Sequence, residues 1–334
     1  MLPAKTILLL FLPLCFSKSV DITFKKVTFR GYSLYTEKFK KTIPSSNSLK
    51  EFLPKSAFDK IEFIEQKIPV LYENSLADLE DLDELVIEHC NKLEEIKEGV
   101  FNNLALSTLD LSQNDITTIE SSAFDNLPNI LNINLADNNI GAWDKNWFKN
   151  TPLLTRISMQ NNSIAKLPNN AFKNLVGVKK FGKVDLTINL VLSYNKIKTI
   201  EPKAFNGLTK INNLWLDNNQ LENFDENLLD KVKVNDLRIN QNNIRCLDGD
   251  LAKIIKADTT HLDANPLDCE CLNNIKTWAE KNGKVIEIFF SEMDCAAQRI
   301  KMKMNALTKR LKEIRDQDND IEVAEGHPTS NPIK

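Results

Sequence analysis

The sequence predicts an α/β solenoid, in which short parallel strands line a concave sheet and turns form the convex face. The prediction rests on a motif, LxxLxLxxNxL, that recurs nine times, most clearly at Leu106–Ile116 and Ile211–Leu221. Successive Asn positions lie 24, 24, 24, 24, 33, 24, 23 and 23 residues apart. Because one such unit cannot bury its apolar face alone, nine copies in phase predict one continuous core built by stacking.

Each copy of the motif begins with a strand. In the third copy, Leu109 and Leu111 alternate with polar residues at the period of two that a half-buried strand requires. The motif and its period resemble the leucine-rich repeat. This resemblance implies a horseshoe with a parallel concave sheet and about nine repeats over residues 58–267.

The Asn position of the motif is expected to form a hydrogen-bond ladder inside the solenoid. Its side chain turns the chain after the strand and bonds backbone groups of the neighbouring coil. Gln66 holds this position in the first copy. Cys90 replaces asparagine in the second copy, so we interpret it as a buried structural thiol. From the second copy on, the ladder consists of Cys90, Asn114, Asn138, Asn162, Asn195, Asn219, Asn242 and Asn265.

The turns of successive repeats carry a second periodic feature, a bulky residue five positions after an inward-pointing apolar one. Phe124 follows Ile119 in this way, and Phe148 follows Trp143, which we assign to the core. The bulky residues are predicted to stack as a spine beneath the convex face. They are Phe101, Phe124, Phe148, Phe172, Phe205 and Leu229.

Residues 1–17 have the features of a secretory signal peptide, with an apolar run from Ile7 to Leu14 followed by small residues. This run is too short to span a bilayer, so we expect a secreted, extracellular protein without a transmembrane anchor. Removal of this segment leaves 42 basic and 46 acidic residues, a formal charge of −4. Mild acidity argues against nucleic acid as a partner. Residues 18–57 then form an N-terminal cap that has no cysteines.

The cysteines predict disulfides at the other end of the solenoid. Once Cys15 is removed and Cys90 is assigned to the ladder, an even set of four remains, which is typical of oxidising compartments. Cys246 and Cys269 both lie four residues after a ladder asparagine, in adjacent coils, so their pairing is the first choice. The other pair is then Cys271–Cys295. Zinc binding by the same four residues is the alternative, and otherwise no metal or cofactor is expected.

Residues 268–296 are predicted to form a C-terminal cap with a helix around Leu272–Lys281, whose Trp278 packs on the last coil. Residues 297–316 form an amphipathic basic helix, because apolar residues recur there at helical spacing. This helix either docks on the cap, pairs with another helix through residues 299–315, or lies on a membrane surface. Residues 317–334 are polar and predicted to be a disordered tail.

The gap of 33 residues between Asn162 and Asn195 marks an insertion of about nine residues. The strand register over Phe181–Leu190 is open, because two segments there resemble strands. The first segment, VKKFGKVDL, is interpreted as an extra edge strand or a bulging loop. The second segment, NLVLSYN, is interpreted as the true repeat strand. Such a departure from the repeat is either a binding loop or a tolerated insertion.

The segment NPLDCEC, the helix with Trp278 and the later Cys295 resemble the C-terminal cap of extracellular leucine-rich repeat proteins. Within that family the chain is most similar to secreted arthropod members, including the mosquito leucine-rich immune proteins. The resemblance implies a curved, non-catalytic binding protein, often in innate immunity or cell-surface recognition. The chain departs from the family in its cysteine-free N-terminal cap and in its single cysteine after the cap helix.

Outward-pointing strand residues between the inward leucines give the candidate ligand site. The N-terminal third of this surface is acidic, whereas the C-terminal third has an exposed tryptophan beside an arginine, the two residue types most enriched in binding hot spots. A stack of Trp215 on Arg238 without any ligand is the alternative. The predicted patch is Trp215, Arg238, Val191 and Tyr194, flanked by Asp217 and Asp236. A sequon places a glycan on Asn161, at the edge of this face.

These observations predict a secreted protein that binds an extracellular protein or glycan through its concave face. The family resemblance implies a role in innate immunity or receptor modulation. An extracellular-matrix or cell-adhesion component is the alternative. Catalysis is not expected, because the repeat brings together no nucleophile–base pair, metal set or phosphate loop. The ligand and the oligomeric state do not follow from the sequence.

Overall fold

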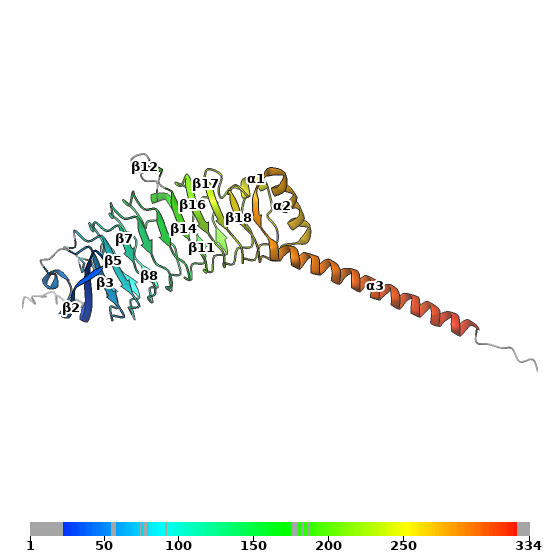
Figure 1. Ribbon diagram of the computed structural model, residues 1–334, viewed down its shortest axis with the longest axis horizontal. Helices are drawn as coiled ribbons and strands as arrows, with labels where there is room; N and C mark the ends of the chain where they lie inside the picture. Colours follow the sequence, from blue (N-terminus) through cyan, green and yellow to red (C-terminus); the bar gives the residue numbers. More distant parts are fainter. Residues whose placement is uncertain are drawn as a thin grey trace, which may run out of the picture.

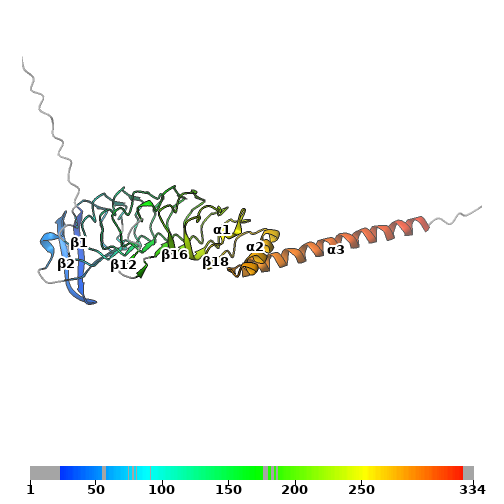
Figure 2. The same cartoon turned by 90° about the horizontal axis from the view of Figure 1, so that it is seen from above.

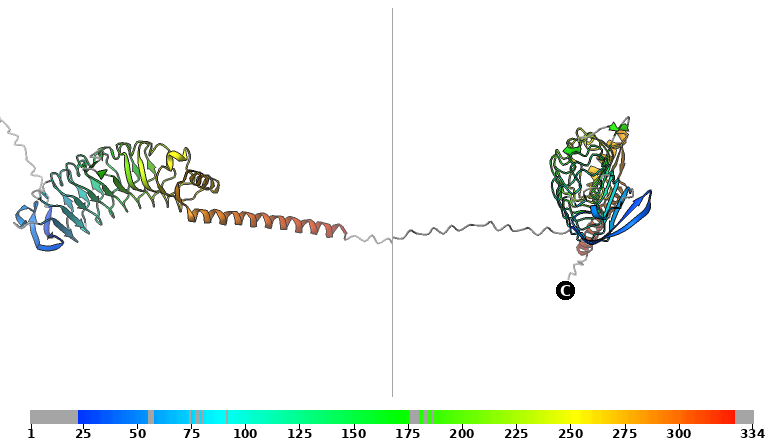
Figure 3. Two further views of the ribbon diagram at one scale, coloured as in Figure 1. Left: turned by 45° about the horizontal axis from the view of Figure 1, so that its top comes forward. Right: turned by 90° about the vertical axis from the view of Figure 1, so that its left-hand side faces the viewer.

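The computed structural model describes residues 23–54, 58–73, 75–76, 79, 81–90, 92–175, 180–181, 184–185 and 187–325. Its centre is a twelve-stranded sheet in the order β19-β18-β17-β16-β14-β10-β9-β7-β5-β3-β1-β2. Figure 1 and Figure 3 show the strands stacked side by side along a curved solenoid. The predicted α/β solenoid with about nine repeats is therefore confirmed.

Ten strands of this sheet are parallel and line the concave face. They are β3 (Lys60–Ile64), β5 (Glu84–Glu88), β7 (Thr108–Asp110), β9 (Asn132–Asn134), β10 (Arg156–Ser158), β14 (Ile188–Val191), β16 (Lys210–Trp215), β17 (Lys233–Arg238), β18 (Thr259–His261) and β19 (Val285–Glu287). The first nine are the repeat strands. The tenth, β19, belongs to the C-terminal cap and was not predicted, because it lies outside the repeat motif.

The segments that connect successive repeat strands form short strand ladders and a helical turn on the side opposite the concave sheet. These are β4 (Val70–Leu71), β6 (Glu95–Ile96), β8 (Thr118–Ile119), β11 (Lys166–Leu167), β15 (Thr199–Ile200) and the 3-10 helix η2 (Lys173–Leu175). A second 3-10 helix, η1 (Lys50–Phe52), precedes the first repeat strand. The phenylalanine spine beneath the connecting segments is confirmed. Phe124 stacks between Phe101 and Phe148 at centroid distances of 5.9 and 5.6 Å. Phe172 stacks on Phe205 at 5.5 Å.

Buried asparagines hold neighbouring coils together. The Asn138 amide nitrogen donates to the carbonyl of Leu111, one coil back, at 2.9 Å, and its oxygen accepts from the backbone N–H of Ile116 at 3.1 Å. The same pattern recurs at each later asparagine. Cys90 lies fully buried in this column, and its backbone N–H donates to the Asn114 side-chain oxygen at 2.8 Å.

The N-terminal cap is a hairpin of β1 (Phe24–Ser33) and β2 (Thr36–Ser46), with β1 antiparallel to β3. Phe63, from the first repeat, stacks between Phe24 and Phe29, all three fully buried. Gln66 continues the ladder into the cap, because its side chain accepts from the N–H of Thr28 at 2.7 Å. Aromatic packing thus closes this end without a disulfide.

The insertion between the fifth and sixth repeats is a small antiparallel hairpin of β12 (Lys180–Phe181) and β13 (Val184–Asp185). The segment after it, β14, pairs in parallel with both β10 and β16. The second of the two strand-like segments is therefore the repeat strand, and the first forms an additional hairpin outside the main sheet.

The C-terminal cap consists of the short helix α1 (Leu251–Ile254), α2 (Cys269–Asn282), β19 and the start of α3 (Phe289–Glu325). The predicted cap helix is present but begins at Cys269 rather than near Leu272. Trp278 packs against the core cluster.

The four predicted cysteines form two disulfides, but the predicted pairing was wrong. The bonds join Cys246 to Cys271 and Cys269 to Cys295, with Cα–Cα distances of 5.6 and 5.5 Å. The prediction assumed that Cys269 continues the coil, whereas it begins α2. Residues two apart in a helix point in nearly opposite directions. Cys271 therefore faces the solenoid, and Cys269 faces α3.

Helix α3 differs from the prediction in length and in position. It runs unbroken from Phe289 to Glu325, through the expected boundaries at residues 297 and 316, because no glycine or proline interrupts it before Gly326. Its first turns belong to the cap, but beyond Cys295 the helix does not dock on it. Ile300, Met304 and Leu307 are each about 60% exposed, and Figures 1 and 2 show α3 extending away from the repeats. The predicted signal peptide and residues 326–334 lie outside the described residues.

Candidate functional site

The C-terminal third of the concave sheet carries a fixed aromatic–cation pair. Trp215 ends β16 and Arg238 ends β17, in register with each other. The Arg238 guanidinium carbon lies 4.2 Å from the centre of the Trp215 ring. The Trp215 indole N–H donates to Asp236 Oδ2 at 2.9 Å, and Arg238 Nε donates to the same oxygen at 3.1 Å. One carboxylate therefore orients both side chains.

This network continues across two further strands. Asp236 Oδ1 lies 2.8 Å from Nε2 of His261, whose Nδ1 lies 2.6 Å from Glu287 Oε2. His261 is on β18 and Glu287 is on β19, so the network spans four adjacent strands. Glu287 could not be placed from the repeat pattern, because β19 has no copy of the motif. Both ring nitrogens of His261 face carboxylates, which leaves neither free to activate a nucleophile.

The other predicted patch residues have different surroundings. Tyr194 is 52% exposed at the rim, and Asp217 accepts a hydrogen bond from Ser193 Oγ at 2.6 Å. Val191 was predicted to be exposed, and this was wrong. It is on the concave face, but only 2% of its surface is accessible. The small side chain is in register with the much larger Trp215 and is shielded between neighbouring strands.

The patch is therefore a set of half-buried polar and aromatic groups in a prearranged geometry. An indole face carrying a guanidinium presents apolar area and charge together, and its hydrogen-bond donors are partly used within the patch. Such an arrangement recognises a ligand through shape, stacking and charge. Trp215 and Arg238 do stack on each other, as the alternative without a ligand predicted.

The N-terminal third of the sheet is acidic, as expected. Lys60 Nζ lies 3.0 Å from both Glu62 and Glu84 and neutralises part of this charge. Burial and the neighbouring Asp110 carboxylate raise the pKa of Glu88 above its ordinary value. Repulsion among these carboxylates disfavours an anionic ligand at this end.

Two other predicted residues have clear positions. Burial raises the pKa of the Cys90 thiol to about 11, which suits a structural thiol and not a nucleophile. Asn161 is exposed beside the sheet, and its side chain donates to Asp137 Oδ1 at 2.7 Å.

A protein-family model described as the BspA type leucine rich repeat region matches six copies over residues 50–179 and 176–254. These ranges cover more than half of the chain. The chain belongs to this leucine-rich repeat family. The narrower resemblance to arthropod immune proteins stays a prediction.

Among solved structures, this chain is similar to the TLR13 chain in the crystal structure of the TLR13–ssRNA13 complex. The TM-score is 0.53 and the sequence identity is 26%, over 61% of this chain. The match spans only 29% of the TLR13 chain. The search of curated proteins returned no significant match.

Within the described ranges, no helix is both long and apolar enough to cross a membrane. In the same part of the chain, no three His, Cys, Asp or Glu side chains are grouped so as to hold a metal ion. The four disulfide cysteines are fully used in the two bonds, which removes the alternative of a zinc site built from them.

Proposed function

We propose that this leucine-rich repeat protein is a secreted binding protein whose concave face recognises an extracellular protein around Trp215 and Arg238. The observation that carries the proposal is the Trp215–Arg238 stack, held by Asp236 in the open concave sheet. Tryptophan and arginine dominate binding hot spots when polar groups surround them. Tyr194 is exposed nearby at the rim, and its backbone N–H donates to the carbonyl of Asp217 at 3.0 Å. A glycan ligand is the second chemistry that such a stack suits.

The extracellular location is supported by the two disulfides and by the expected signal peptide. A role in innate immunity is supported by the family resemblance and by the similarity to TLR13. That structure is a complex with ssRNA13, but the acidic net charge of this chain does not favour RNA as its partner. A role as a matrix or adhesion component remains the alternative, in which several faces are bound at once.

The proposal predicts that Trp215→Ala and Arg238→Ala each weaken binding of the partner by more than ~1 kcal/mol, with normal secretion. Affinity is measured by biolayer interferometry against the partner isolated from extracellular fluid. Arg156→Ala is the matched control, because Arg156 is an exposed arginine on the same sheet, on β10. Unchanged affinity in both patch variants would contradict the proposal.

Helix α3 is a second candidate contact, through residues 299–315. Its apolar row is exposed at Ile300, Met304, Leu307 and Leu311, which favours pairing with another helix over docking on the cap. The basic residues on its other faces keep membrane-surface binding as the alternative.

We also propose Asn161 as a glycosylation site. A mass loss after glycosidase treatment, absent in Asn161→Gln, tests it.

A further inference from the structure

The turn between β1 and β2 exposes two large side chains that contribute nothing to the core. Leu34 is 81% exposed and Tyr35 is 100% exposed. Both have left-handed backbone conformations, with φ of 50° and 64°. Asparagine and glycine are preferred at such hairpin positions. Leu34 and Tyr35 thus occupy positions that asparagine or glycine would suit better. Neither side chain is buried there.

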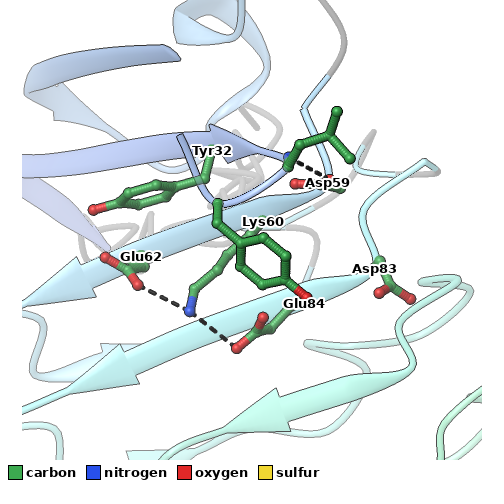
Figure 4. Close-up of a pocket in the computed structure, with 8 residues that line it drawn as sticks. Tyr32, Asp59, Lys60, Glu62, Asp83 and Glu84 are labelled. Atoms are coloured by element: carbon green, nitrogen blue, oxygen red, sulfur yellow. Dashed lines mark hydrogen bonds and ion pairs between the residues drawn. The ribbon is translucent and has the colours of Figure 1, made fainter. Parts of the chain in front are cut away.

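This exposed turn forms one wall of a cavity of about 310 Å³ at the N-terminal end of the sheet. Figure 4 shows the cavity with the ring of Tyr32 and the hairpin turn above the strands. The opposite wall comes from the first two repeats. It contains Asp59, Lys60, Glu62, Asp83 and Glu84.

The charges of the cavity do not balance. Lys60 is the one basic residue of the lining, and it is held between Glu62 and Glu84 at 3.0 Å from each. Desolvation by burial lowers the pKa of Lys60, but its hydrogen bonds to Glu62 and Glu84 outweigh this effect. The pKa of Lys60 is therefore raised above its ordinary value. Four carboxylates facing one ammonium leave a formal charge of −3 at neutral pH.

The carboxylates have different structural roles. Asp59 accepts a hydrogen bond from the N–H of Leu34 at 3.1 Å and so holds the turn over the cavity. Glu62 and Glu84 are engaged with Lys60. The Asp83 side chain is exposed and makes no hydrogen bond or ion pair with any described residue. Asp83 therefore remains available to an external cation.

We propose that this cavity binds an arginine or lysine side chain from an extended segment of a protein partner. The aliphatic part of that side chain packs along Tyr32 and Leu34, and its charged end reaches Asp83 and Glu84. A cation also interacts favourably with the face of a tyrosine ring. A small free cation would leave the Tyr35 and Leu34 side chains uncovered, whereas a polypeptide covers them.

This site is separate from the patch around Trp215. Strands β7, β9, β10 and β14 lie between β5 and β16 in the sheet, a separation of roughly 24 Å at the ordinary strand spacing. The cavity can therefore bind its ligand whether or not Trp215 and Arg238 contact anything. Loss of binding at the cavity would therefore not contradict binding at Trp215 and Arg238, and the reverse also holds.

The test uses fluorescence anisotropy of the full chain with a labelled Ala-Arg-Ala-Arg-Ala peptide. The same peptide with citrulline in place of arginine keeps the shape and removes the charge. We expect the arginine peptide to bind at least tenfold more tightly than the citrulline peptide. Asp83→Asn and Tyr35→Asn should each weaken its binding at least fivefold. Both substitutions are at exposed positions, and asparagine tolerates the left-handed turn.

Glu222→Gln is the control, since Glu222 is an exposed acid far along the chain and lies outside the cavity lining. It should bind the arginine peptide as the unchanged protein does. The proposal is overturned by equal binding of the arginine and citrulline peptides, or by full binding in Asp83→Asn/Tyr35→Asn. An equal loss in Glu222→Gln would show non-specific attraction by net charge, and tighter binding of spermidine than of the peptide would show a small-cation site.

Discussion

At the residue scale, one buried asparagine in each of the last seven repeats satisfies backbone groups that belong to two different coils. Asn138 is 6% exposed and bonds Leu111 in the preceding coil, its own turn, and the N–H of Ile116. A backbone group that is buried without a partner costs about 1–3 kcal/mol. The ladder therefore fixes the stacking of the strands, and so the spacing of the residues on the concave face.

Asn138→Ala is expected to lower the free energy of unfolding by about 1–3 kcal/mol, because it leaves the buried Ile116 N–H without its partner and removes one of the two amide donors to the Leu111 carbonyl. Urea denaturation followed by circular dichroism measures the change. Asn139→Ala is the matched control, since the Asn139 side chain is exposed. Its effect should stay within about 0.5 kcal/mol. Equal effects of the two substitutions would argue against the ladder.

The thiol of Cys90 provides a second test at this scale. Burial raises its pKa to about 11, so the thiolate is scarce at pH 8 and is also shielded from reagents. Iodoacetamide at pH 8 should therefore alkylate Cys90 only after the protein is unfolded. Peptide mass spectrometry before and after denaturation measures this. Alkylation of the native protein at the rate of a free thiol would show that the site is open.

At the scale of elements, the two ends of the solenoid are closed by different means. Stacked phenylalanines close the N-terminal end, and two disulfides tie α2 to the last coil and to α3. Beyond Cys295, every α3 side chain that the structure describes is exposed. The cap therefore ends near Cys295, and the remainder of α3 contributes no burial to the monomer.

Truncation after Arg299 is accordingly expected to change the melting temperature by less than about 2 °C. Replacement of the Cys269–Cys295 bond by two alanines is the contrasting variant, and should cost about 2–5 kcal/mol. Differential scanning calorimetry compares the two. If truncation destabilised the protein as much as loss of the disulfide, α3 would have to pack on the repeats in solution.

At the scale of the whole molecule, features that repeat could be predicted in detail, whereas features that occur once could be predicted only in outline. The strands, the ladder and the phenylalanine spine each follow from many copies of one pattern. The disulfide pairing depends on where α2 begins, and the His261–Glu287 contact depends on β19. Neither α2 nor β19 belongs to a repeat. The burial of Val191 depends on the size of its neighbour Trp215, which an alternation of inward and outward residues does not register.

The candidate surfaces follow the same division. The Trp215–Arg238 pair was predicted, since both residues come from equivalent positions of adjacent repeats. The N-terminal cavity was not, because it forms between a non-repeating hairpin and the first two strands. The sequence alone does not show that Leu34 and Tyr35 are exposed in a turn, which is the feature of the structure that indicates the cavity. The solenoid thus holds two candidate contacts at opposite ends of one rigid sheet.

The central claim is that the concave face binds the partner, and cross-linking of the captured complex tests it most directly. The tagged protein is used to recover its partner from extracellular fluid, and cross-linked lysines are located by mass spectrometry. We expect cross-links at Lys210 and Lys233, which begin the strands of Trp215 and Arg238, and loss of the partner in Trp215→Ala/Arg238→Ala. A partner that the double variant retains, with cross-links only at Lys301 and Lys303 of α3, would contradict the claim.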